Sequence, residues 1–104
     1  MANTANNGIK KNWSLISFAK EFGKPQLAHL TNKETGEKYD AVAFGEGNNI
    51  TFVSFSRKLG PLSAKEIKEQ KDELQVVLCE TTQGNDMYAL CHQGESSWED
   101  IDLF

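Results

Sequence analysis

The sequence predicts a single domain that is mainly β with one short helix. Stretches of alternating apolar and polar residues recur along the chain, and turn-forming stretches such as Gly23-Lys24-Pro25, GEGNN and Gly84-Asn85 separate them. Only one stretch, residues 62–74, opens with a clear helix-start signal. At 104 residues with 38% hydrophobic content, the chain is long enough for one core and too short for two.

The first predicted element is a strand in NWSLISFAKEF, residues 12–22. Its apolar residues alternate imperfectly, as they do in a strand that contains a bulge or bend. Residues 26–32 and 33–44 then predict the two strands of a hairpin that turns around Thr35-Gly36. Residues 50–59 give a further alternating stretch, which carries an aromatic residue on each face.

The predicted helix follows Gly60-Pro61. Ser63 and Glu66 have the spacing of a capping box, and Leu62 and Ile67 supply apolar contacts. Residues 74–93 predict a last hairpin that turns at Gly84-Asn85.

Composition divides the chain into three parts. Residues 1–11 lack a periodic apolar pattern and are expected to be a flexible N-terminal arm. Residues 12–94 are expected to form the folded domain, and residues 95–104 an acidic C-terminal tip. Several strands, one helix and a final hairpin suit an OB-like five-stranded barrel, whose long first strand often bends. A curved antiparallel sheet with one packed helix accepts nearly the same elements, and a sandwich is a further alternative.

Motifs of common enzyme classes are absent from the sequence. It contains no phosphate-binding glycine loop, no HExxH, no CxxC pair and no GxSxG. His29 and His92 are isolated, and Cys79 with Cys91 falls short of the four or so ligands of a zinc site. We therefore expect a protein that is not an enzyme and has no metal or cofactor.

Cysteine usage and hydropathy indicate the compartment. Two cysteines are too few for a disulfide scaffold and are expected to be reduced core residues. No stretch approaches the roughly 20 apolar residues of a membrane span, and the N-terminus lacks the apolar run of a signal peptide. The sequence therefore predicts a cytoplasmic protein with no membrane partner.

Charge is distributed unevenly along the chain. The formal net charge of −4 resides in the tail, in Glu95, Glu99, Asp100 and Asp102, because the remaining acids balance the 11 basic residues. Up to Lys58 the chain has eight basic residues and five acids. This asymmetry indicates a basic surface together with an acidic segment that can compete for it.

Aromatic and basic side chains are concentrated in the same first half. Rings stack on bases and cations contact phosphates, so the combination is typical of proteins that bind single-stranded nucleic acid. The pairs Phe18 with Lys20 and Phe55 with Arg57 carry most weight, because residues i and i+2 of a strand share a face. About half of the aromatic residues, a set that includes Phe44, are expected in the core. The candidate nucleic-acid-binding residues are Trp13, Phe18, Lys20, Phe22, Lys24, Lys38, Tyr39, Phe52, Phe55, Arg57 and Lys58.

The chain ends in SSWEDIDLF, in which acids alternate with apolar residues before a terminal Phe. This peptide resembles the C-terminal tip of bacterial and phage single-stranded DNA-binding proteins, which follows an OB-fold core. The resemblance implies sequence-tolerant binding of single-stranded DNA in replication, recombination or repair, and a tip that recruits partner proteins and competes with DNA. The partner-binding residues that it implies are Trp98, Glu99, Asp100, Ile101, Asp102, Leu103 and Phe104.

The tip also departs from the family pattern. It is less acidic than the family's tip and has Leu103 where proline is usual. The linker before it is only about HQGESS, and so short a linker limits the reach of the tip. A compact protein with such a short linker is more like a phage protein than a cellular one. Its four large apolar residues could instead complete the core.

A protein-only interaction module, such as a phage-encoded inhibitor or adaptor, is the alternative function and suits the net charge; a small enzyme or nuclease accessory ranks third. Edge strands offer a route to a homo-oligomer.

Overall fold

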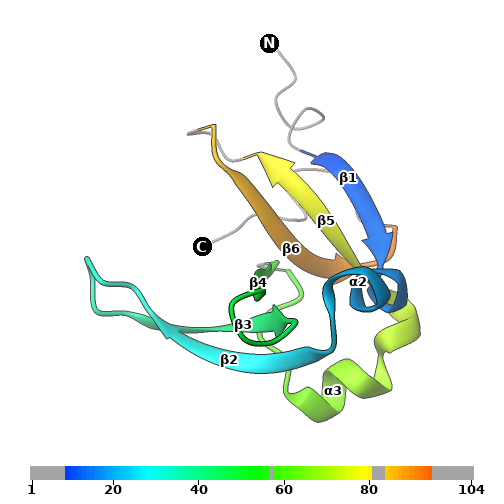
Figure 1. Ribbon diagram of the computed structural model, residues 1–104, viewed down its shortest axis with the longest axis horizontal. Helices are drawn as coiled ribbons and strands as arrows, with labels where there is room; N and C mark the ends of the chain where they lie inside the picture. Colours follow the sequence, from blue (N-terminus) through cyan, green and yellow to red (C-terminus); the bar gives the residue numbers. More distant parts are fainter. Residues whose placement is uncertain (1–8, 57, 81–83, 95–104) are drawn as a thin grey trace.

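The computed structural model describes residues 9–56, 58–80 and 84–94, and the chain there forms one six-stranded mixed sheet with two α-helices (Figure 1). The strand order is β1-β5-β6-β4-β3-β2. β4 and β6 are parallel, and every other neighbouring pair is antiparallel. The elements are β1 (Ile9–Ser14), α2 (Leu15–Phe22), β2 (Pro25–Thr31), β3 (Lys38–Phe44), β4 (Thr51–Phe55), α3 (Ala64–Glu69), the 3₁₀ turn η1 (Lys71–Glu73), β5 (Leu74–Glu80) and β6 (Asp86–His92).

The mainly β fold class is confirmed, but the five-stranded OB-like barrel is not. The sheet is open, with β1 at one edge and β2 at the other. β1 begins at Ile9, inside the segment predicted as an arm; residues 1–8 lie outside the described part of the chain. Both predicted hairpins, β2–β3 and β5–β6, are present.

The strand predicted over residues 12–22 is wrong beyond Ser14, and α3 is therefore not the only helix. Ser14 caps α2, because its Oγ accepts a hydrogen bond from the Ser17 N–H at 3.1 Å. Gly23 ends the helix with a φ of 115°, and its N–H donates to the Ala19 carbonyl at 2.9 Å.

Helical periodicity explains the imperfect alternation of this segment. Leu15, Phe18 and Phe22 are spaced at i, i+3 and i+7, which places them on one face of α2. Leu15 and Phe18 are buried on the sheet, and Phe22 packs beside them. Burial of this stripe stabilises a helix of only eight residues, which would be marginal in isolation.

The capping box predicted for α3 is confirmed. The Ser63 Oγ accepts from the Glu66 N–H at 3.2 Å, and the Glu66 carboxylate accepts from the Ser63 N–H at 3.0 Å. The hydrogen bond from the Ser63 backbone lowers the pKa of Glu66 from its ordinary value.

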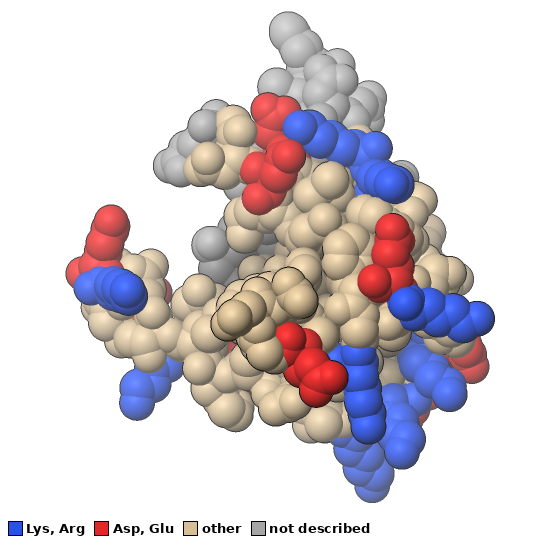
Figure 2. Space-filling model, in the orientation of Figure 1, with Lys and Arg blue, Asp and Glu red and all other residues tan. Residues whose placement is uncertain are grey.

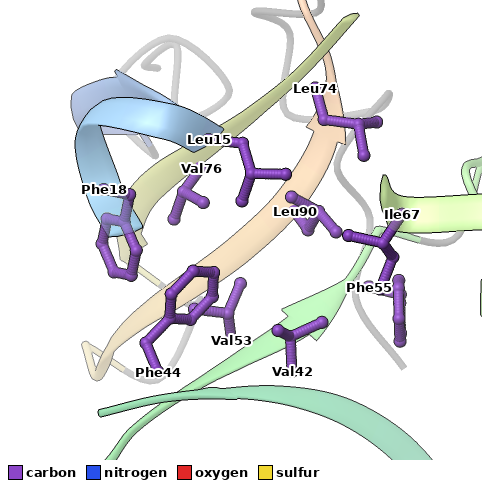
Figure 3. Close-up of a cluster of buried hydrophobic side chains, with 10 residues drawn as sticks. All are labelled: Leu15, Phe18, Val42, Phe44, Val53, Phe55, Ile67, Leu74, Val76 and Leu90. Atoms are coloured by element: carbon purple, nitrogen blue, oxygen red, sulfur yellow. The ribbon is translucent and has the colours of Figure 1, made fainter. Parts of the chain in front are cut away.

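Both helices lie on the same face of the sheet, and the main core is between them and the strands (Figure 3). Phe18 and Phe44 meet edge to face at its centre, with ring centroids 4.7 Å apart. In the described part of the chain, no helix is long and apolar enough to cross a membrane. The buried residues of this core are Leu15, Phe18, Val42, Phe44, Val53, Phe55, Ile67, Leu74, Val76 and Leu90.

Candidate nucleic-acid interface

The face of the sheet opposite the helices carries two exposed aromatic residues. On β3 and β4 the residues that enter the main core are Val42, Phe44, Val53 and Phe55. Side chains alternate along a strand, so the intervening residues lie on the other face. Tyr39 and Phe52 are among them, and these two residues are 45% and 49% exposed.

Small residues separate the two aromatic rings. Ala41 of β3 pairs with Ser54 of β4, and this pair lies between Tyr39 and Phe52 on the same face. The two rings and this small pair line a hollow of about 270 Å³. We call this the aromatic hollow; its lining residues are Leu30, Tyr39, Ala41, Phe52, Ser54, Asp86, Met87 and Tyr88.

A larger hollow of about 840 Å³ continues from it toward the end of the β2–β3 hairpin. The two share Leu30, Tyr39, Ser54 and Met87, so they form one continuous surface. Figure 2 shows the molecule hollowed beside the projecting β2–β3 hairpin. The hairpin thus builds one wall and the start of β6 the other.

The two rings are too far apart to clamp one planar group. Phe52 pairs with Ala43, which is four residues after Tyr39 on β3. At about 3.3 Å per residue and about 4.8 Å between strands, the backbone positions of Tyr39 and Phe52 are about 14 Å apart. Each ring can therefore stack on a separate base of an extended strand.

The charges around this surface are mainly negative. Of the described residues that line the two hollows, Lys38 is basic, whereas Glu37, Asp40 and Asp86 are acidic. His29 also lines the larger hollow, and its Nδ1 lies 2.6 Å from the Asp40 Oδ1 across β2–β3. In Figure 2 blue side chains gather over α2 and α3, away from the hollow, and others lie on the projecting β2–β3 hairpin and near β1. Any ligand that fits here is recognised more by its flat apolar surfaces than by negative charge.

Several predicted aromatic contacts are corrected by burial. Phe18 is 0% exposed and Phe55 is 3% exposed, so both rings, like that of Phe44, belong to the core and offer no face to a base. Phe18 and Lys20 do not share a face either, because they lie on α2, where two residues are separated by more than half a turn.

Trp13 and Phe22 are partly buried against the same core. Trp13 packs edge to face on both Phe18 and Phe22, and its Nε1–H donates to a Glu21 carboxylate oxygen at 3.0 Å. These contacts give Trp13 a structural role at the junction of β1 and α2.

Of the predicted cations that the structure describes, only Lys38 lines either hollow, and it lines the larger one. Lys20, Lys24 and Lys58 are exposed elsewhere on the surface. Arg57 and the predicted partner-binding residues, Trp98 to Phe104, lie outside the described residues. The structure thus brings together Lys38, Tyr39 and Phe52. Phe55 also borders the larger hollow but is only 3% exposed, and the other described candidates lie apart.

The cysteines do not form a reactive site. Cys79 and Cys91 are both fully buried, and the strand register sets Cys79 opposite Met87 and Cys91 opposite Gln75. Burial raises the pKa of the Cys79 thiol to about 11, which keeps it protonated and unreactive at neutral pH. Among the described residues, no group of three or more His, Cys, Asp or Glu is arranged to hold a metal ion.

Sequence reasoning missed the apolar neighbours of the two rings, Leu30 and Met87, and the small pair Ala41 and Ser54. The alternation of β4 already put Phe52 and Ser54 on one face. The contribution of β6 was not visible, because nothing local in the sequence pairs β4 with β6. Comparisons with protein-family models, with curated proteins and with solved structures give no match to this chain.

Proposed function

We propose that this protein binds single-stranded DNA without sequence preference, by stacking bases on Tyr39 and Phe52. The observation that carries the proposal is the pair of half-exposed rings on an open sheet face, with a floor of small residues between them. Every base has a π-face, so such a surface accepts any sequence.

The rigidity of the support favours this function. Val53, next to Phe52 on β4, is buried in the core, whereas Lys38 and Asp40, next to Tyr39 on β3, are not buried. Phe52 is therefore held on a strand that is anchored in the core, and little ordering of this ring is needed when a ligand binds. The proposal rests on this open face and does not require an OB-like barrel.

The local charge predicts how binding depends on salt. A protein that neutralises several phosphates loses affinity steeply as salt rises, with a slope of about −0.7 per phosphate for single strands. Among the described residues that line the aromatic hollow and the larger hollow, one is a lysine and three are acids. We therefore expect stacking to supply most of the affinity and the salt slope to correspond to about one phosphate contact.

The experiment is a fluorescence titration of labelled oligo-dT with the wild type and single variants. Tyr39→Ala and Phe52→Ala should each weaken binding by about 1–3 kcal/mol, or about 5- to 150-fold, because each removes one stacking surface. Ile16→Ala is the matched control: Ile16 is 42% exposed but lies on α2, away from the hollow, so its loss should leave the affinity unchanged.

The titration also separates this function from the alternative. If the wild type does not bind oligo-dT at low salt, or if both ring variants bind as tightly as the wild type, the stacking proposal is wrong. A protein-only interaction module is then favoured by Glu37, Asp40 and Asp86, which with the exposed rings suit a basic peptide that carries apolar side chains. Recruitment of replication or repair proteins by residues 98–104 remains a proposal based on the resemblance of the tip.

A further inference from the structure

The two edges of the sheet differ in how well they are protected against pairing with another strand. β1 carries Lys10 and Lys11 and has an irregular register at Ile9–Lys11, and these are common devices that block edge-to-edge association. β2 has a regular seven-pair register with β3 and contains no Lys, Arg, Asp or Glu. The one residue of β2 that discourages pairing is Pro25. It occupies the first position of the strand, so the backbone of the residues after it stays available for pairing.

The hydrogen bonds of the β2–β3 ladder show which groups of β2 remain free. The Asn32 N–H donates to the Glu37 carbonyl at one end of the ladder, and the Gly45 N–H donates to the Lys24 carbonyl at the other. Backbone groups alternate in direction along an antiparallel strand, so the even-numbered residues of β2 bond to β3. The odd-numbered residues direct their N–H and C=O groups outward, and in the described part of the chain no strand lies beyond them.

We propose that the β2 edge binds the β2 edge of a second copy of this chain, in an antiparallel pair centred on Ala28. In this register Leu27 lies opposite His29 of the other copy, and Pro25 opposite Thr31. Each copy has three outward N–H groups, on Leu27, His29 and Thr31, and all three meet a carbonyl of the other strand. The missing N–H of Pro25 falls at the end of the pair, where it costs least.

Charge favours a second copy at β2 over a second copy at β1. An antiparallel pair of β1 strands would bring Lys10 and Lys11 near the same lysines of the other copy, which is unfavourable. A pair of β2 strands brings together no Lys, Arg, Asp or Glu. Antiparallel pairing of identical strands also gives the closed two-fold symmetry that most homodimers have.

Such a dimer would extend the candidate interface. A two-fold axis perpendicular to the sheet leaves each face on its own side, so both aromatic hollows would lie on the same face of one twelve-stranded sheet. That consequence rests on the proposed function, whereas the dimer itself does not. Measuring the mass of the protein without nucleic acid therefore tests the dimer independently.

The first test is light scattering after size exclusion, on the full chain. The wild type should have twice the chain mass of 11.6 kDa. His29→Pro removes an outward N–H that β3 does not use, and should give the single mass with an unchanged circular dichroism spectrum. His29→Ala is the matched control, because it also loses the contact with Asp40 but keeps the N–H, and it should remain a dimer.

A cysteine pair tests the register. Ala28 would lie opposite Ala28 of the second copy in a non-hydrogen-bonded pair, with Cα atoms about 4.5 Å apart, which a disulfide can span. Ala28→Cys should therefore cross-link under mild oxidation. Thr31→Cys should not, because the two copies of residue 31 would be about 20 Å apart. A single-mass wild type at every concentration, a His29→Pro protein that keeps the double mass, or equal cross-linking of the two cysteine variants would overturn the proposal.

Discussion

At the scale of single residues, Phe52 and Phe55 lie on the same strand, but only Phe52 is exposed. Phe55 points into the core beside Val42 and Ile67 (Figure 3), whereas Phe52 lies on the opposite face and is about half exposed. Three positions along a strand reverse the face of a side chain. The two rings therefore have different roles, one in stability and the other in the candidate interface.

Phe55→Ala should lower the free energy of unfolding by about 3–5 kcal/mol, because it removes a buried ring and leaves a cavity. Phe52→Ala, on the same strand, should change it by less than about 1 kcal/mol. Urea unfolding of both variants measures the difference. Similar losses for the two would show that Phe52 also contributes to packing and would remove it from the candidate interface.

The alternation of residues 50–56 can be recognised in the sequence, but which of the two faces is buried cannot be predicted from it. One face offers Ile50 and Phe52 and the other Val53 and Phe55, so both carry an apolar and an aromatic residue. The choice is made by α2 and α3, which pack on the side of Val53 and Phe55. Without the positions of the helices, the aromatic residues of the core and those of the surface cannot be distinguished.

At the scale of elements, the two helices show why one was predicted and the other was not. The capping box of Ser63 and Glu66 predicts the start of α3 from the sequence. The cap of α2 is Ser14, which has no acid three residues later, so no capping box predicts this helix. α2 is also just over two turns long, so its apolar spacing repeats too few times to be separated from an irregular strand.

Ser14→Ala should lower the free energy of unfolding by about 1 kcal/mol, since the Ser17 N–H at the start of α2 would lose its acceptor. Ser17→Ala is the control: it removes the neighbouring hydroxyl but keeps that N–H and its partner, so it should cost clearly less. Chemical denaturation measures both. Equal losses would mean that the Ser14 side chain contributes little as a cap.

At the scale of the whole molecule, local pairings were predictable and the order of the sheet was not. The hairpins β2–β3 and β5–β6 follow from turn residues and alternation over short stretches. The pairings β1 with β5 and β4 with β6 join segments far apart in the sequence, and no local pattern specifies them. The candidate interface depends on the second of these, which is why its lining by Met87 and Tyr88 was not predicted.

Deletion of residues 96–104 tests the role of net charge. It removes Glu99, Asp100 and Asp102 and changes the formal net charge from −4 to −1, which reduces the repulsion between the protein and DNA. Affinity for oligo-dT should rise at low salt and match that of the full chain at high salt, where long-range repulsion is screened. Titration at two salt concentrations measures this. The same gain at both would contradict an electrostatic origin.

The parallel pairing of β4 with β6 also constrains the order in which the chain can fold. β2, β3 and β4 can assemble as a meander of neighbouring segments as soon as they have been synthesised. β6 must already be present to join that meander to β5, and β1 must wait for β5 although it is made first. Because loop closure delays such distant pairings, docking of the β5–β6 hairpin should be the slow step. Until then one side of β4 is an unpaired edge, and the nascent protein is most prone to aggregation.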